Sequence, residues 1–136
     1  MQTYLLDTNA FSALMDEHPK MLARSAKLST ADRVLICAIV RGEIRYGLER
    51  MPPGRRQRDF SAKAADLFAR TPCVDISETM SDIYGRIKRE CERQGTALTE
   101  NDLWIAACAL NLQAVLVTSD SDFENVAGLS CEDWTQ

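Results

Sequence analysis

Apolar residues follow two patterns along this chain. Short continuous apolar runs at residues 4–6, 34–37 and 115–117 are typical of strands that are covered on both faces. Between these runs, apolar residues recur at spacings of three and four, which predicts amphipathic helices. The pattern predicts strands at 4–6, 34–37, 74–76 and 115–118, helices at 9–16, 20–28, 39–50, 55–70, 78–94 and 100–111, and a last extended piece near 129–131.

Capping residues support several of these boundaries. Ser77 and Thr99 precede predicted helices and are favourable N-caps, and Gly95 suits the position just after a helix. Short strands that alternate with helices predict an α/β domain with a mainly parallel central sheet. No linker or repeat divides the sequence, so we expect one domain over residues 1–136.

Composition narrows the class of protein. Of the 136 residues, 46% are hydrophobic and 26% are charged, as in soluble globular proteins. No apolar run approaches the roughly 20 residues of a membrane span, and the N-terminus lacks a basic leader. The five cysteines are scattered and His18 is the only histidine, which disfavours a zinc site or a disulfide framework. We therefore expect a cytoplasmic protein.

The net charge of −4 is not that of a protein held to nucleic acid mainly by charge. Basic residues nevertheless gather at 45–63 and 86–93. These segments are either ordinary solvated helix faces or sites of phosphate contact. The candidate phosphate contacts are Arg50, Arg55, Arg56, Arg86 and Arg89.

Four acids lie beside the ends of predicted strands and helices. Asp7 follows the first strand and Asp120 follows the strand 115–118. Glu43 lies in the helix after the second strand, and Asp102 lies in the first turn of its helix. Sites in parallel sheets form beyond the carboxyl ends of the strands, so we expect these four acids to share one edge of the sheet. Carboxylates gathered in this way would need a divalent cation and point to phosphodiester chemistry.

Each acid also has an ordinary structural explanation. Asp7 could cap a helix, and Thr99 with Asp102 has the form of a capping box. Glu43 could form a salt bridge on an exposed helix face. Asp120 and Asp122 could belong to a turn, and their loop lacks the glycine and terminal glutamate of an EF-hand. Asp120 is nearer the strand end and is the better candidate of the two.

Four sequence blocks together resemble the PIN-domain ribonucleases, and most of all the VapC-type toxins of prokaryotic toxin–antitoxin pairs. The closing Gly128-Leu129 and Glu132-Asp133-Trp134 are similar to the tail of that subfamily. The resemblance implies a Rossmann-like, three-layer α/β/α sandwich. The blocks are Leu6-Asp7-Thr8-Asn9, Glu43-Ile44-Arg45-Tyr46-Gly47, Asn101-Asp102-Leu103-Trp104-Ile105-Ala106-Ala107 and Val117-Thr118-Ser119-Asp120-Ser121-Asp122-Phe123.

The resemblance also implies an endoribonuclease that uses one or two Mg²⁺ or Mn²⁺ ions and leaves 5′-phosphate and 3′-hydroxyl ends. By position, Asp7, Glu43 and Asp102 match the three core acids of the family. Asp120 matches a fourth, more variable acid, and Asp122 is an outer or substitute ligand. The polar residues that match positions orienting the carboxylates are Asn9 and Thr118.

The implied partners are an RNA substrate such as tRNA, rRNA or mRNA, a second copy of the chain, and an antitoxin encoded alongside. By analogy, the antitoxin would lodge a basic side chain among the acids and an apolar face in a groove formed by residues 10–28 and 39–70.

Three other functions compete with this one. A receiver domain also gathers aspartates at a sheet edge, but it needs a lysine after a late strand, and no lysine follows Lys88. A non-catalytic RNA- or protein-binding module would keep the fold without turnover. A metal-dependent DNA nuclease or phosphatase would use the same acids on another substrate.

Overall fold

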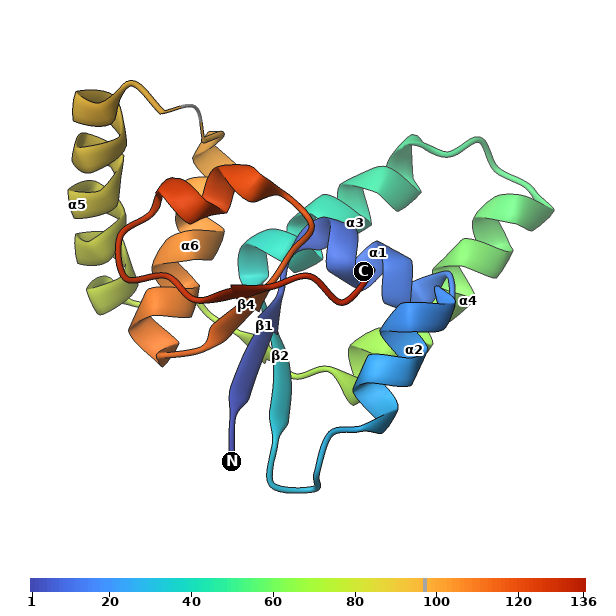
Figure 1. Cartoon of the computed structure of the whole chain (residues 1–136). Coiled ribbons are helices and arrows are strands. Elements are labelled where there is room, and N and C mark those ends of the chain that lie inside the picture. The colour runs from blue at the N-terminus through green and yellow to red at the C-terminus, as the bar shows by residue number, and fades with distance from the viewer. Residues whose placement is uncertain (97) are drawn as a thin grey trace.

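The computed structural model describes residues 1–96 and 98–136. Its centre is a five-stranded sheet in which every pairing is parallel, with the strand order β3-β2-β1-β4-β5 (Figure 1). The strands are β1 (Thr3–Leu6), β2 (Arg33–Cys37), β3 (Cys73–Val74), β4 (Val115–Val117) and β5 (Cys131–Glu132).

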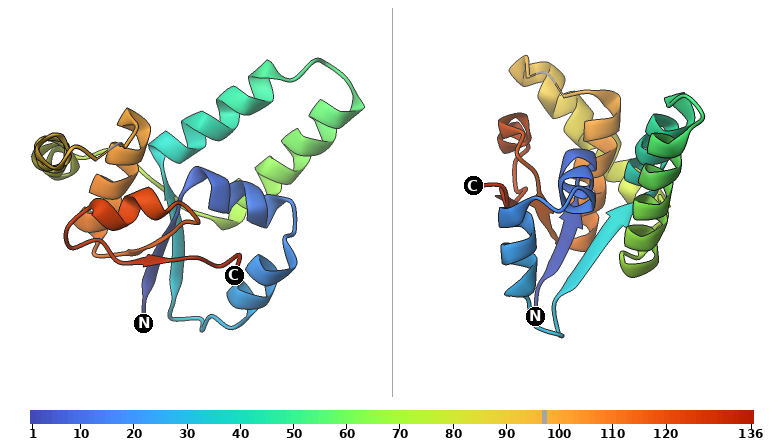
Figure 2. Two further views of the ribbon diagram at one scale, coloured as in Figure 1. Left: turned by 45° about the horizontal axis from the view of Figure 1, so that its top comes forward. Right: turned by 90° about the vertical axis from the view of Figure 1, so that its right-hand side faces the viewer.

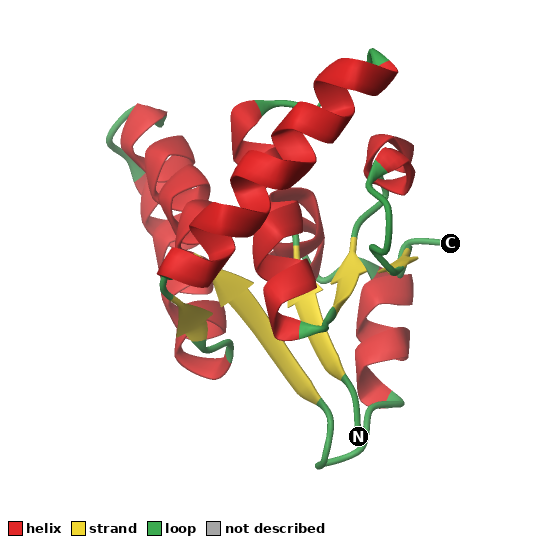
Figure 3. Ribbon diagram, turned by 90° about the vertical axis from the view of Figure 1, so that its left-hand side faces the viewer, coloured by secondary structure: helices red, strands yellow, loops and turns green. Residues whose placement is uncertain are grey.

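Helices lie on both sides of this sheet, as the two turned views show (Figure 2), and Figure 3 separates them from the strands by colour. The expected three-layer α/β/α architecture is thereby confirmed. The helices are α1 (Thr8–Met15), α2 (Pro19–Ala26), α3 (Ala38–Arg50), α4 (Arg55–Arg70), α5 (Glu78–Gln94) and α6 (Glu100–Leu112), followed by a short 3₁₀ helix, η1 (Ser121–Asn125).

Burial on both faces of the sheet explains why the sequences of the central strands are continuous apolar runs. Leu5 of β1 and Leu116 of β4 are fully buried, because helices cover both faces of the central strands. Helix α6 is buried from Ile105 to Ala109, so it packs deep in the molecule. None of the described helices is long and apolar enough to cross a membrane.

The strand order creates a switch point between β1 and β4. The chain runs outward from β1 to β2 and β3, then returns to form β4 and β5 on the other side of β1. Leu5 pairs with Leu116, and the Asp7 N–H donates to the Val117 carbonyl oxygen at 3.1 Å. In such sheets the crevice at the carboxyl ends of these two strands is the usual place for a site. The residues that follow β1 and β4 flank that crevice.

Some predicted boundaries were wrong in detail. Helix α2 begins at Pro19, one residue earlier than predicted, because His18 caps it: His18 Nδ1 accepts the Lys20 N–H at 3.2 Å. Strand β3 ends at Val74 where the prediction ran to 76, and β5 extends to Glu132. The acidic segment after β4, predicted as a loop, forms η1.

Candidate active site

Asp7 lies at the end of β1 and caps α1. The residue is 5% exposed, and its Oδ1 accepts the Ala10 N–H at 2.7 Å. Burial raises the pKa of the Asp7 carboxyl above its ordinary value. Hydrogen bonds from the Thr118 hydroxyl and from Ala10 lower this pKa, and the charges of Asp102 and Asp120 raise it again. Asp7 therefore caps a helix, and its carboxyl also interacts electrostatically with other acids.

Thr118 links the ends of β1 and β4. It is buried, its Oγ1 accepts the Asp120 N–H at 3.0 Å, and the preceding Val117 carbonyl oxygen accepts the Asp7 N–H at 3.1 Å. Asp120 in turn caps η1, since its Oδ1 accepts the Asp122 N–H at 2.9 Å. Asp120 is half-buried and Asp122 is exposed. The order of preference expected from the sequence matches this difference in exposure.

Glu43 is held by Thr8, which was not among the candidate residues predicted from the sequence. Glu43 lies half-buried on α3, and its Oε1 accepts a hydrogen bond from Thr8 Oγ1 at 2.5 Å. Thr8 is the first residue of α1, directly after Asp7. Its position beside Asp7 was the one available signal, but the packing of α1 against α3 was needed to show that it faces Glu43.

Asp102 belongs to the N-terminal turn of α6. Thr99 caps this helix as predicted, because its Oγ1 accepts the Asp102 N–H at 3.1 Å. Burial raises the pKa of the Asp102 carboxyl, a hydrogen bond with Thr99 lowers it, and the charges of Asp120, Glu43 and Asp122 raise it further. The negative charges of three other acids therefore contribute to the raised pKa of Asp102.

The acids share one electrostatic field but do not converge on a single point. Among residues 1–96 and 98–136, no three His, Cys, Asp or Glu side chains are placed to hold one metal ion as they stand. Within that same part of the chain, Asp7, Glu43, Asp102, Asp120 and Asp122 form no ion pair with a lysine or arginine. Hard oxygen donors with uncompensated charge fit Mg²⁺ or Mn²⁺ in chemistry. The side chains would have to turn toward one another to bind it.

Of the two predicted orienting residues, Thr118 contacts an acid and Asn9 does not. Asn9 is exposed on α1, and none of the hydrogen bonds found within the described residues joins it to a carboxylate. Both residues line a small cavity of about 80 Å³ beneath the C-terminal tail.

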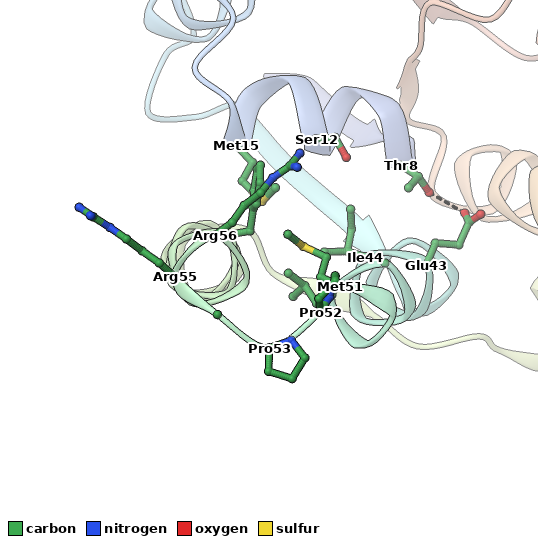
Figure 4. A pocket seen from close by; sticks show the side chains of 14 residues that line it. Thr8, Ser12, Met15, Glu43, Ile44, Met51, Pro52, Pro53, Arg55 and Arg56 are labelled. Atoms are coloured by element: carbon green, nitrogen blue, oxygen red, sulfur yellow. Dashed lines mark hydrogen bonds between the residues drawn. The ribbon is translucent and has the colours of Figure 1, made fainter.

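An apolar groove of about 630 Å³ begins at Glu43 and runs between α1, α3 and α4 (Figure 4). Figure 4 shows the Thr8–Glu43 hydrogen bond at one end and Arg55 and Arg56 at the other. Arg56 extends toward Ser12 and Met15, whereas Arg55 points away from the groove. The apolar residues of the groove include Met15, Ile44, Leu48, Met51, Pro52, Pro53 and Phe60.

The candidate phosphate-binding arginines are in different surroundings. Arg56 lies 5.5 Å from the Phe60 ring centroid and Arg50 lies 5.4 Å from that of Tyr46, so both rest on aromatic faces. On α5, Arg89 pairs with Glu92 at 3.4 Å. Among the described residues, Arg89 is thus the one of these five arginines that forms an ion pair.

Comparison with known proteins decides the family. The family profile of the PIN domain matches residues 4–129. The chain belongs to the PIN-domain family. This PIN domain is 33% identical to ribonuclease VapC1 of Haemophilus influenzae (strain R2866), with 98% of each chain covered. It is 26% identical to the tRNA(fMet)-specific endonuclease VapC of Shigella flexneri, covering 99% of this chain and 100% of that one.

Solved structures agree with this assignment. The PIN domain superimposes on VapBC2 from Rickettsia felis, bound to a DNA fragment from their promoter, with a TM-score of 0.89 and 27% identity over 98% of this chain and 99% of that chain. For VapBC-1 from nontypeable Haemophilus influenzae the TM-score is 0.87 and the identity is 31%, over 99% and 100% of the two chains. Within the PIN family, the chain is thus a VapC-type protein.

Replacement of Asp7 by asparagine should stabilise the metal-free protein. Asparagine keeps the helix cap but removes a buried charge. Because the folded-state pKa of Asp7 is raised, its contribution to stability falls as pH rises above the ordinary value of about 4. In EDTA at pH 7, Asp7→Asn should therefore raise Tm by a few degrees, which corresponds to a gain of about 1 kcal/mol in unfolding free energy. The gain should shrink as the pH is lowered toward 4.

The matched control is Asp66→Asn, which breaks the exposed Asp66–Arg70 pair on α4 and should change the unfolding free energy by less than about 0.5 kcal/mol. A Tm lower than wild type for Asp7→Asn would mean that the carboxylate charge itself holds the fold together.

Proposed function

We propose that this PIN domain is a metal-dependent endoribonuclease that acts as the toxin of a VapBC-type pair and inhibits translation by hydrolysing RNA phosphodiester bonds. The observation that carries the proposal is a group of four acids around the switch point of the sheet that form no ion pair with lysine or arginine among the described residues: Asp7, Glu43, Asp102 and Asp120. The names of the relatives, ribonuclease VapC1 and tRNA(fMet)-specific endonuclease VapC, support RNA as the substrate.

PIN-domain nucleases depend on divalent metal, and we propose Mg²⁺ or Mn²⁺, as one or two ions, for this chain. Asp7, Glu43 and Asp102 would hold the metal with Asp120, and Asp122 would serve as an outer or substitute ligand. When bound, a divalent metal neutralises phosphate charge and lowers the pKa of a water molecule that it binds.

The other residues of the site hold these ligands in place. The Ala10 N–H donates to Asp7 Oδ1 and Thr8 donates to Glu43 Oε1, so each of these bonds engages one oxygen of its carboxylate. His18 caps α2, where its Nδ1 accepts the Lys20 N–H, and it is not needed as a general base when a metal activates the water. The proposed chemistry therefore depends on the carboxylates and their metal, without a histidine.

Removal of any of the core acids should abolish cleavage and leave the fold intact. Asp7→Asn, Glu43→Gln and Asp102→Asn should each lower RNA cleavage by more than about 100-fold, because each removes a proposed ligand worth several kcal/mol of charge stabilisation. The measurement is cleavage of a purified RNA pool with millimolar Mg²⁺, together with sequencing of the RNA ends and a Tm for each variant.

Asp66→Asn, on the exposed side of α4, serves as the control and should cleave like wild type. Full activity in Asp7→Asn would contradict the assignment. RNA binding that persists in EDTA, without cleavage when metal is restored, would instead identify a non-catalytic binding module, and cleavage of DNA alone would identify a DNA nuclease.

We further propose that RNA phosphates bind along α4. Arg55 and Arg56 lie at the end of the groove that begins at Glu43, and Lys63 joins them around a neighbouring hollow of about 410 Å³. Arg50 precedes this segment, whereas Arg86 and Arg89 lie on α5. We therefore assign the larger share of phosphate contacts to Arg55 and Arg56 and a smaller share to the α5 pair.

Salt dependence of RNA binding tests this assignment. In the Asp102→Asn background, which prevents cleavage, the double change Arg55→Ala with Arg56→Ala should reduce the slope of log Kd against log salt by about 1.4, or about 0.7 for each lost contact. The matched double change Arg86→Ala with Arg89→Ala should alter the slope less. The reverse order would place the RNA across α5.

The antitoxin is the second proposed partner, and we propose that it binds in the groove shown in Figure 4. The solved relatives are VapBC assemblies, which supports a protein partner. An amphipathic segment could bury its apolar face against Met15, Ile44 and Met51 and direct a basic side chain to Glu43. The homodimer implied by the family resemblance stays a prediction.

A charge placed in the groove should separate antitoxin binding from catalysis. Met51→Asp should weaken capture of the co-expressed antitoxin by at least about tenfold, since an unpaired carboxylate would be buried at the contact. The kcat of RNA cleavage at saturating RNA should stay within about twofold of wild type, because Met51 is not among the acids. Leu22→Asp, at an exposed position on α2, is the control and should bind antitoxin normally. Unchanged capture by Met51→Asp would place the antitoxin elsewhere.

A further inference from the structure

Arg24, from the N-terminal part of the chain, meets Glu132 and Trp134 of the C-terminal tail at the edge of the sheet. Glu132 Oε1 accepts hydrogen bonds from Arg24 Nη2 at 3.2 Å and from Trp134 Nε1 at 2.9 Å. Arg24 Nη2 also donates to the Tyr4 hydroxyl at 3.1 Å. We refer to Arg24, Glu132 and Trp134 as the tail clamp.

Aromatic packing reinforces these hydrogen bonds. The guanidinium of Arg24 lies 5.5 Å from the ring centroid of Tyr4 and 5.1 Å from that of Trp134. The two rings meet edge to face, with centroids 5.2 Å apart. Trp134 is buried, whereas the Arg24 and Glu132 side chains are 32% and 39% exposed. A partly exposed ion pair contributes little energy by itself, so the role of the clamp lies in ordering the groups that it joins.

The clamp is connected to the active site through the backbone of β5. The Glu132 carbonyl oxygen accepts the Thr118 N–H at 2.9 Å, while the Glu132 side chain is held by Arg24 and Trp134. Thr118 Oγ1 accepts the Asp120 N–H at 3.0 Å, and the carbonyl oxygen of the preceding Val117 accepts the Asp7 N–H at 3.1 Å. The clamp is therefore joined to Asp120 through Thr118 and to Asp7 through the adjacent backbone of β4.

Two further contacts bring the clamp close to the site. Tyr4 belongs to β1, the strand that ends just before Asp7. Trp134 lines the cavity of about 80 Å³ that Asn9 and Thr118 also line. The clamp thus lies against both of the strands that flank the switch point.

Strand β5 is too short to be stable without additional contacts such as the tail clamp. It consists of Cys131 and Glu132 alone and pairs only with β4 among the described strands. A two-residue edge strand is marginal without additional packing. If β5 opened locally, the Thr118 amide would lose its acceptor, and Thr118 would be free to move away from Asp7.

From these contacts we propose that the tail clamp positions Thr118, and through it Asp7 and Asp120, for metal binding and cleavage. Arg24, Glu132 and Trp134 act here as positioning residues and do not touch the substrate. The functional half of this proposal rests on the nuclease function proposed above. The structural half, that the clamp fixes Thr118, stands independently of it.

Three variants test the clamp at different strengths. Trp134→Phe removes the indole donor and keeps a ring in place, Glu132→Gln removes the charge, and Arg24→Gln removes the cation. Arg70→Gln breaks the exposed Arg70–Asp66 pair on α4, at 3.1 Å, and is the matched control. Glu132→Gln is the mildest change and decides the outcome if either of the other two fails to fold.

The first readout is amide hydrogen exchange followed by NMR in metal-free protein. Exchange of the Thr118 and Asp7 amides should become about tenfold faster in the clamp variants, as expected for local opening at the β4 edge. The Ile36 amide, which donates to Pro72 O at 3.0 Å on the opposite side of β1, should keep its wild-type rate. Arg70→Gln should change none of these rates.

The second readout is metal and RNA chemistry. The Mn²⁺ concentration that gives half of the maximal Tm shift should rise about tenfold in the clamp variants, the lower end of the effect of residues that support metal ligands. The kcat of RNA cleavage should fall with little change in KM, since the proposed phosphate contacts on α4 are untouched.

Two results would overturn the proposal. One is wild-type exchange at Thr118 and Asp7 in all folded clamp variants. The other is an unchanged Mn²⁺ midpoint and kcat alongside a general loss of Tm, which would reduce the clamp to a structural role. A wild-type protein that binds Mn²⁺ but cleaves no RNA would instead refute the nuclease function, and the exchange rates and Mn²⁺ midpoints would still decide whether the clamp positions the site.

Discussion

The rest of the site depends on a buried carboxylate, that of Asp7, held at the end of a central strand without a basic partner. Burial of an ionised carboxylate costs several kcal/mol, whereas a hydrogen bond to a charged group returns about 1.5–3 kcal/mol. The bond from the Ala10 N–H therefore offsets only part of the cost, and burial raises the pKa of the Asp7 carboxyl. A divalent cation bound at this place would supply the missing compensation. Metal-free Asp7 thus carries an uncompensated electrostatic cost at the proposed metal site.

The strand order, rather than any local motif, determines which acids share this deficit. Asp7 and Asp120 follow neighbouring strands, while α3 and α6 bring in Glu43 and Asp102 from the crossover connections. The groove begins at the same glutamate and ends among arginines. RNA and antitoxin would thus compete for one continuous surface, so that a partner filling the groove would also cover part of the proposed phosphate path.

Apolar periodicity predicted the parallel sheet, and strand-end position predicted the edge at which the acids lie, because both are local signals. The three layers were implied by the family resemblance. Sequence alone did not predict the Thr8–Glu43 bond, which depends on how α1 packs against α3. It also missed η1, since Asp-Ser-Asp suits a turn and a 3₁₀ helix equally well. The separation of the acid side chains was beyond sequence reasoning, because it depends on rotamers and on whether metal is bound.

The pairing of β1 with β4 has a consequence for how activity arises. Leu5 and Leu116 come from opposite ends of the chain, and parallel strands of this kind associate late because a long loop must close first. Three of the four acids, Asp7, Glu43 and Asp102, lie within that loop, and Asp120 follows it. A chain in which β1 and β4 have not yet paired would therefore lack the assembled set of acids, so the proposed cleavage would require the completed sheet.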